Sequence, residues 1–439
     1  MHADRAKRSQ RSAGRELFRR LLPLALFAAL SHAGGGFAQS GRSLEPADWP
    51  GLWGPDRTAR VAGPLQILPT VQLKEVWRRP IGKGFSEVAV AGGRGYTMFS
   101  EADVDYLGAF DVATGKETWR RRLEATYHGH DGSLDGPIST PVLAGGRLFA
   151  LTPWGKLFAV EQATGREVWR LDLKADLGAA APFWGFATSP LPLGGILVVQ
   201  AGGATSNSLV ALDPASGKLV WSAHPASGTG YSSPVAMTLQ GVPQIVAATQ
   251  DKVFAVRPVD GAVLWSAPSL GETRQSPVSL PGDRVLLTNW YETAVLQVKS
   301  DGGAWGVREL WRKPVFKTTY SPAVYRQGYL YGMNGNFLTC LDVETGETKW
   351  REKIYNAALL LAGGYLAALG EQSGDFRLVE ASPEGFRQRL KARIFTPGAL
   401  SMTGPMFVSG RFLLRNGEEM VLLELAPAET AAGAARNGS

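Results

Sequence analysis

The side chains best suited to chemistry lie in one short stretch. His128, His130 and Asp131 are almost adjacent, and Asp135 follows four residues later. Imidazole and carboxylate groups bind transition metals, so a zinc or copper site is one interpretation. The one other histidine between residues 39 and 439 is His224. Because no third histidine lies nearby, we favour the alternative, a polar glycine-rich loop, and predict no metal ligands.

Other catalytic arrangements are missing from the sequence. It contains no nucleophile elbow, no phosphate-binding glycine loop and no zinc-protease helix motif. Cys340 is the one cysteine, which excludes an internal disulfide and a cysteine-based zinc site. We therefore predict no catalytic and no cofactor-binding residues.

The 13 tryptophans include two sets of different meaning. One set recurs at a regular spacing, which indicates packing: Trp77, Trp119, Trp169, Trp221, Trp265, Trp311 and Trp350. A second set stands outside that spacing: Trp154, Trp184, Trp290 and Trp305. We expect these four in connections, where exposed aromatic side chains more often recognise a ligand. Packing and binding both remain open for this second set.

The regular spacing reflects an internal repeat. The segment from Leu107 to Trp119 recurs, with substitutions, from Leu157 to Trp169. Its marker positions are residues 77, 119, 169, 221, 265, 311, 350 and 390, which are 39 to 52 residues apart. Repeats of about 40 to 50 residues with several strands each are typical of a β-propeller.

Each repeat predicts four antiparallel strands. The sequence Asp-x-x-Thr/Ser-Gly predicts a hairpin turn in which glycine adopts positive φ and the aspartate accepts hydrogen bonds from turn amides. The following strand ends in the marker Trp, which is large enough to cover the seam between neighbouring sheets. A second hairpin begins at Ser/Thr-Pro, because proline is tolerated as the first residue of a strand.

Counting the repeats predicts closure by both ends of the chain. Seven repeats occupy about residues 86–393, and residues 401–425 supply strands but no Trp-ending strand. Residues 71–78 contain Trp77 and can supply it. We therefore predict an all-β, eight-bladed propeller of four-stranded antiparallel blades, with the last blade closed by the N-terminal strand 71–78. Such closure leaves no open sheet edge.

The connections that enter the innermost strands should converge at one mouth of the ring. We expect any binding site at that mouth, on a rim that is aromatic and of mixed charge. The candidate rim residues are Tyr127, His128, His130, Asp135, Trp184, Phe186, Tyr231, Arg274, Lys317, Tyr320 and Met402.

The basic charge is concentrated at the N-terminus. Residues 1–20 hold seven Lys or Arg and two acidic residues, a net of +5, so the formal charge of +7 falls to +2 without them. This basic region, an apolar run over residues 21–30 and small residues after it are typical of a secretory signal peptide, expected over residues 1–38. A short membrane anchor is the alternative. We expect an extended lead-in over 39–69, the propeller over 70–425 and a flexible tail over 426–439.

The expected export and the small net charge outside residues 1–20 restrict the classes of partner that we expect. A net charge of +2 without a basic stripe argues against nucleic acid. No cysteine lies near the expected cleavage site, so we expect a periplasmic or secreted monomer without a lipid anchor. The Arg19-Arg20 pair leaves the general and the twin-arginine export routes open.

The repeat resembles the PQQ-like β-propeller repeat family, of the quinoprotein-dehydrogenase-like and BamB-like superfamily, over about residues 45–425. Residues 48–57, 135–141 and 184–190 further resemble an exported bacterial subgroup, although Trp53 stands where we expect Arg. The resemblance implies either a scaffold, like the lipoprotein of the outer-membrane β-barrel assembly machinery, or a quinoprotein alcohol dehydrogenase, which binds pyrroloquinoline quinone and calcium.

We expect a non-enzymatic scaffold or binding module without a cofactor, which presents its rim loops to a protein or polymer partner. Quinoprotein dehydrogenases resemble one another in an adjacent cysteine pair beside the quinone, whereas Cys340 stands alone at a small core position of its repeat. The alternatives are a quinone-dependent oxidoreductase and a propeller that binds a glycan or small molecule in its central funnel.

Overall fold

The computed structural model describes residues 48–61, 63, 65, 67, 71–131, 133–202, 208–225, 230–317 and 321–427. The chain forms two units, Met1–Gly36 and Phe37–Ser439, and every described residue belongs to the second. The expected signal peptide (residues 1–38) and residues 428–439 of the expected tail lie outside the described residues. No helix in the described ranges is long and apolar enough to cross a membrane.

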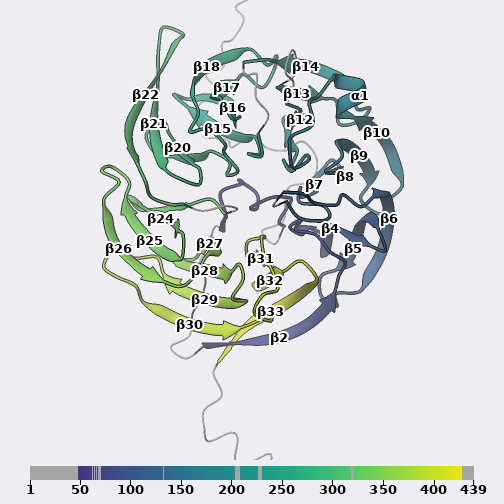
Figure 1. Cartoon of the computed structure of the whole chain (residues 1–439), viewed down its shortest axis with the longest axis vertical. Coiled ribbons are helices and arrows are strands. Elements are labelled where there is room, and N and C mark those ends of the chain that lie inside the picture. Colours follow the sequence, from purple (N-terminus) through teal and green to yellow (C-terminus); the bar gives the residue numbers. More distant parts are fainter. Residues whose placement is uncertain are drawn as a thin grey trace, which may run out of the picture. The chain divides into compact units, whose positions relative to one another are not determined.

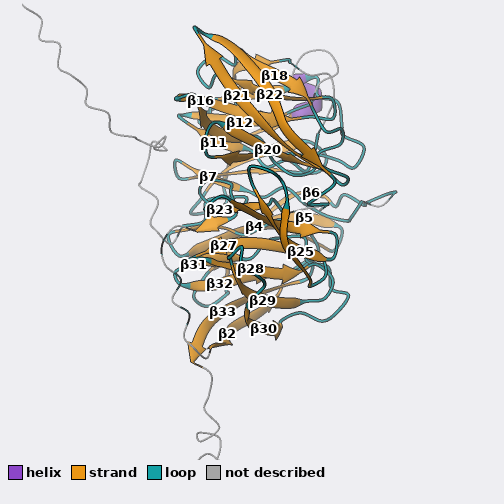
Figure 2. Cartoon of the chain, turned by 90° about the vertical axis from the view of Figure 1, so that its left-hand side faces the viewer, coloured by secondary structure: helices purple, strands orange, loops and turns teal. Residues whose placement is uncertain are grey.

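The second unit is an eight-bladed β-propeller, which confirms the predicted fold. Eight sheets surround a common centre, seven with four strands and one with five (Figure 1). The strands within each blade pair antiparallel, apart from β1, which adds parallel to β27. Among the described residues the single helix is α1 (Leu173–Leu177), drawn in purple in Figure 2. In the sequence it follows the last strand of the second blade.

The first four blades follow one another along the chain, each from its innermost to its outermost strand. Blades 1 and 2 consist of β3 (Ala89–Ala91), β4 (Arg94–Glu101), β5 (Val104–Asp111), β6 (Glu117–Ala125), β7 (Val142–Ala144), β8 (Arg147–Leu151), β9 (Lys156–Glu161) and β10 (Glu167–Asp172). Blades 3 and 4 consist of β11 (Leu191–Leu193), β12 (Ile196–Gln200), β13 (Leu209–Leu212), β14 (Leu219–Ala223), β15 (Val235–Leu239), β16 (Val242–Ala248), β17 (Lys252–Val256) and β18 (Val263–Pro268).

The remaining blades differ only where the N-terminal strands join them. Blades 5 and 6 consist of β19 (Val278–Leu280), β20 (Arg284–Thr288), β21 (Thr293–Asp301), β22 (Ala304–Lys313), β23 (Val324–Arg326), β24 (Tyr329–Asn334), β25 (Phe337–Asp342) and β26 (Thr348–Lys353). Blades 7 and 8 consist of β1 (Arg60–Val61), β27 (Ala357–Ala362), β28 (Tyr365–Gly370), β29 (Asp375–Glu380), β30 (Gln388–Arg393), β31 (Met406–Val408), β32 (Arg411–Arg415), β33 (Glu419–Pro427) and β2 (Val71–Pro80).

A one-residue bulge lies immediately before the marker position of each blade and turns the marker side chain toward the next blade. In blade 2, Glu167 pairs with Val160 and Trp169 pairs with Ala159, so Val168 is an extra residue. Such a bulge bends a strand and increases its twist. The same shift precedes the marker position in every other blade.

The marker Trp joins neighbouring blades by packing on the turn of the next repeat. Trp119 lies so close to Gly165 that a Cβ on that glycine would approach a ring carbon to 2.6 Å. Gly165 also has a φ of 71°, which glycine adopts without strain. In other seams the indole N–H donates to a turn carbonyl, as from Trp169 to Pro214 at 3.0 Å.

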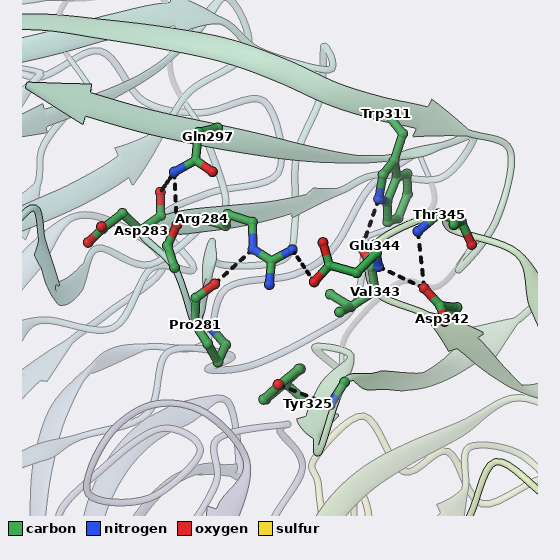
Figure 3. A network of polar contacts seen from close by, with 12 residues as sticks. Pro281, Asp283, Arg284, Gln297, Trp311, Tyr325, Asp342, Val343, Glu344 and Thr345 are labelled. Atoms are coloured by element: carbon green, nitrogen blue, oxygen red, sulfur yellow. Dashed lines mark hydrogen bonds and ion pairs between the residues drawn. The ribbon is translucent and has the colours of Figure 1, made fainter.

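Polar side chains add to the corresponding contact between blades 5 and 6 (Figure 3). The Trp311 indole N–H donates to the Val343 carbonyl at 2.9 Å. Arg284 donates to the Pro281 carbonyl at 2.7 Å and reaches across the seam to a Glu344 carboxylate oxygen at 2.8 Å. The seam therefore combines ring packing with directed hydrogen bonds.

The predicted closure of the ring is present. The N-terminal β2 pairs antiparallel with the C-terminal β33, with Trp77 opposite Leu422. The Trp77 indole then donates to the Val112 carbonyl of blade 1 at 2.9 Å, as four of the other marker tryptophans do to a carbonyl of the following blade. Buried Arg415 also crosses this seam and donates to the carbonyl of Met98 at 3.0 Å.

The packing of Trp119 on Gly165 predicts a specific loss of stability. We expect Gly165→Ala to lower the free energy of unfolding by about 1–3 kcal/mol more than Gly146→Ala, because the added methyl group overpacks the seam. Gly146 is the matched control, since its φ is 76° and nothing lies within 4 Å of an added Cβ. Denaturant titration of both variants measures the difference. Equal losses would contradict the proposed role of the contact.

Candidate functional site

Residues 48–61, which belong to the lead-in expected over 39–69, cross the centre of the ring, where they form turns (Figure 1). The crossing starts at blade 1, where Trp49 pairs with Val90 through two backbone hydrogen bonds of 2.8 and 2.6 Å. It ends at blade 7, where β1 pairs with β27. Three non-glycine residues on the way adopt positive φ: Trp53 at 56°, Arg57 at 54° and Ala59 at 50°. This segment needs contacts that stabilise such strained backbone.

Arg57 supplies one set of these contacts. Its buried guanidinium donates to the carbonyls of Ser189 at 3.1 Å, Pro234 at 3.0 Å and Pro190. These carbonyls belong to the Ser-Pro pairs that open blades 3 and 4, where the inner edge of the sheet has no neighbouring strand. Unpaired backbone groups need partners when buried, and Arg57 provides them. Burial lowers the pKa of Arg57 to about 9, so the side chain stays charged at neutral pH.

The hydroxyl groups of the Ser/Thr-Pro pairs link the innermost strands. The Glu87 amide donates to Thr140 Oγ1 at 3.1 Å, and the Thr140 amide donates to Ser189 Oγ at 2.9 Å. The Ser189 amide in turn donates to Ser233 Oγ at 2.9 Å. The sequence indicated a role for the proline of this motif, but it did not reveal the role of the hydroxyl.

Glu87 takes the Ser/Thr place in blade 1, and sequence reasoning missed it because no proline follows. Its two carboxylate oxygens accept from the backbone amides of Trp53 at 2.9 Å and Gly404 at 3.2 Å. Glu87 thus joins the crossing segment to blade 8. Its side chain is buried, which raises its pKa to about 7 because water no longer stabilises the charged form.

A small cavity remains beside the crossing segment. Its volume is about 120 Å³, and Trp53, Glu87 and the Ser/Thr hydroxyls line part of its wall. Four candidate rim residues also line it: Trp184, Tyr231, Arg274 and Met402. A cavity of roughly 150 Å³ holds one benzene ring, so a volume of about 120 Å³ is enough for a single side chain.

Aromatic side chains from the connections between blades, and from the hairpins β8–β9 and β20–β21, form a continuous arc beside the cavity. We call this group the aromatic arc, and its members are Trp154, Tyr127, His130, Phe183, Trp184, Tyr231, Arg274 and Trp290. Along the arc from Trp154 to Tyr231, the centres of neighbouring rings are separated by 5.0 to 6.3 Å. Arg274 continues the arc, because its guanidinium carbon lies 4.4 Å from the ring centre of Trp184 and 4.7 Å from that of Trp290.

Several candidate rim residues lie outside the arc or the cavity. Phe186 is buried in the core between blades 2 and 3, against Gly155. His128 is exposed, with ring nitrogens 3.7 Å from Asp103 and 3.8 Å from Asp135. No group of three or more metal-binding side chains occurs in the described ranges. Lys317 lies separately, in the connection between blades 5 and 6, and Tyr320 falls outside the described residues.

Of the second set of four tryptophans, which stand outside the repeat spacing, three belong to the aromatic arc and one packs on the core. Trp154, Trp184 and Trp290 belong to the aromatic arc, and Trp154 and Trp290 are 41% and 40% exposed. Trp305 instead lies in β22 and packs on the core between blades 4 and 5. Sequence reasoning missed Phe183, which is 61% exposed; its place between Pro182 and Trp184 in a connection was the available signal.

The comparison with protein families agrees with this architecture. The family model described as outer membrane protein assembly factor BamB matches residues 103–352, which is more than half of the chain. The chain belongs to this family. The crystal structure of BamB from Moraxella catarrhalis is similar, with a TM-score of 0.59 and 14% identity over 82% of this chain and 99% of that one. At this identity the likeness shows the fold alone.

Quinone-dependent enzymes are similar as well. Quinohemoprotein alcohol dehydrogenase ADHIIG from Pseudomonas putida HK5 gives a TM-score of 0.62 at 13% identity, over 88% of this chain and 81% of that one. The dehydrogenase subunit of an alcohol dehydrogenase (quinone) from Gluconobacter oxydans (strain 621H) is 29% identical over 143 residues. That match covers 30% of this chain and only 16% of the Gluconobacter protein.

The axial residues do not fit pyrroloquinoline quinone. The quinone is a rigid tricyclic tricarboxylate that needs more room than a cavity of about 120 Å³ provides. The crossing segment with Trp53 and Arg57 occupies the centre where a larger cofactor would have to lie. Glu87 and Arg274 are the charged side chains in the described cavity wall, and both carboxylate oxygens of Glu87 already accept backbone amides.

The buried position of Glu87 predicts a pH-dependent stability. Its folded-state pKa of about 7 lies above its usual value of 4.5, so the folded protein binds this proton more tightly than the unfolded chain. As the pH rises from about 4.5 to about 7, the wild type should lose up to about 3 kcal/mol of unfolding free energy relative to Glu87→Gln. Denaturant titrations of both proteins across this range measure the loss. Parallel pH profiles would contradict it.

Proposed function

We propose that this chain is a non-enzymatic propeller that binds a protein partner through its aromatic arc. The observation that carries the proposal is the exposure of aromatic side chains along one side of one mouth: Phe183, Trp154, Trp290 and, beside them, Tyr291 at 75% exposed. The few residues that supply most of the binding energy in protein interfaces are enriched in Trp, Tyr and Arg. Monomeric proteins seldom expose such a group without a function.

The architecture supports binding more than catalysis. The propeller core is rigid because every seam is filled, whereas the arc is built from connections that can vary without disturbing the blades. The family described as an outer membrane protein assembly factor also supports a protein partner. With the signal peptide expected over residues 1–38, the same relationship supports a location outside the cytoplasm.

We expect a photoreactive phenylalanine analogue at position 183 to give one dominant protein adduct in intact cells. The exposed side chain would contact the partner directly, and mass spectrometry of the adduct identifies it. Trp290→Ala in the same protein should reduce the adduct, because it removes a neighbouring contact of the arc.

Two exposed positions serve as controls. Val259 is 75% exposed in the hairpin between β17 and β18, at the opposite end of the blade, and Tyr355 is 53% exposed between blades 6 and 7. The analogue at either position should not give the adduct. The same adduct at Val259, or none at position 183, would refute binding by the arc.

A quinone-dependent oxidoreductase is the second candidate, favoured by the 29% identity to part of the Gluconobacter enzyme. Since the axial residues do not fit the quinone, we expect no dye-linked alcohol oxidation after adding pyrroloquinoline quinone and calcium to the purified protein. An authentic quinoprotein apoenzyme, reconstituted in parallel, is the positive control. Oxidation together with the visible absorbance of bound quinone would overturn the non-enzymatic proposal.

A further inference from the structure

Arg274 is held rigidly in the connection between blades 4 and 5. Its guanidinium lies between the rings of Trp184 and Trp290, at 4.4 and 4.7 Å from their centres. Its Nε donates to a Glu272 carboxylate oxygen at 2.9 Å. These three contacts fix the plane of the guanidinium before any ligand arrives, so binding costs little further side-chain entropy.

The two terminal nitrogens of this guanidinium are available to a ligand. Within the part of the chain that the structure describes, no acceptor hydrogen-bonds to the terminal nitrogens Nη1 and Nη2 of Arg274. The side chain is 19% exposed and lines the axial cavity. Two parallel N–H donors on a fixed plane match the two oxygens of a carboxylate.

The cavity has room for a group that carries such a carboxylate. Its volume of about 120 Å³ is enough for a single acidic side chain. Leu52, Trp53 and Met402 in the wall would contact the methylene groups of that side chain. Glu87 precedes blade 1, opposite Arg274 in the ring, and its two oxygens already accept backbone amides.

We propose that Arg274 and the axial cavity receive one Asp or Glu side chain from an exposed loop of a protein partner. The apolar neighbours of that acid then pack on Phe183 and Trp290 of the aromatic arc. A uronate polymer is less suited, because it stacks on open ring faces, and Trp184 and Trp290 each give one face to the guanidinium. This inference rests on the proposed function and names the chemical group that the arc recognises.

N-acetylglutamate amide and N-acetylglutamine amide test the inference, because they differ only in the carboxylate. Titrations followed by tryptophan fluorescence and by the NMR signal of the Arg274 Nε–H should show binding of the glutamate compound. Its affinity should exceed that of the glutamine compound about tenfold or more, as expected for charge-assisted hydrogen bonds. Equal affinities, or no change with the glutamate compound, would overturn the inference.

Variants assign the effect to Arg274. Arg274→Gln should abolish binding of the glutamate compound, and Arg274→Lys should weaken it about tenfold, because lysine keeps the charge but loses the planar pair of donors. Arg351→Gln is the matched control, since Arg351 stacks on Phe337 in blade 6, away from the cavity. Trp290→Leu should also weaken binding, and circular dichroism checks that each variant folds. Unchanged binding in Arg274→Gln would contradict the proposal.

A parallel titration with galacturonate separates the possible partners. Tighter binding of galacturonate than of the glutamate compound would assign the site to an acidic sugar and refute a protein loop. If neither carboxylate binds while the analogue at position 183 still gives its adduct, the arc binds a protein without using Arg274. If that adduct is also missing, the proposed function falls together with this inference.

Discussion

The whole ring depends on the contact between the last strand of one blade and the turn of the next. The indole of Trp169, for example, covers Gly217 and donates its N–H to the Pro214 carbonyl. A blade exposes apolar side chains on both faces, so it is stable only when both neighbours cover it. The marker Trp and the turn glycine make this fit, and their repetition sets the angle between blades. A rigid ring is the consequence, and the mouth can then hold binding groups at fixed positions.

Closure extends the same constraint to the ends of the chain. The last seam can form only if a strand from one terminus completes the sheet made by the other, as β2 does with β33. Arg415 strengthens this seam with hydrogen bonds to the carbonyl of Met98 in blade 1 and, at 3.1 Å, to that of Gly84 in the segment that precedes blade 1. Burial lowers the pKa of Arg415 to about 9, but these acceptors keep the charged form bound in place. Joining the termini in one blade leaves no open edge.

The centre of the ring poses a separate problem, because the innermost strands direct unpaired backbone groups toward the axis. The Ser/Thr hydroxyls, Glu87 and Arg57 together satisfy many of these groups. A tightly packed axis leaves space for a side chain but not for a large cofactor. The recognition that we propose therefore lies at the mouth, where Arg274 and the aromatic arc are placed.

The sequence by itself determined the fold: spaced Trp residues and Asp-x-x-Thr-Gly turns are local signals, so the four antiparallel strands of each blade, the blade number and the closing strand could be predicted from them. The fifth strand of blade 7, β1, could not. The convergence of the connections could be predicted too, since Trp184, Tyr231 and Arg274 line the same cavity. Only the tertiary structure placed Phe186 in the core, Arg57 on the axis and Glu87 among the hydroxyls. In an irregular connection the direction of a side chain depends on contacts with residues that are distant in the sequence. The spacing of neighbouring residues cannot predict those contacts.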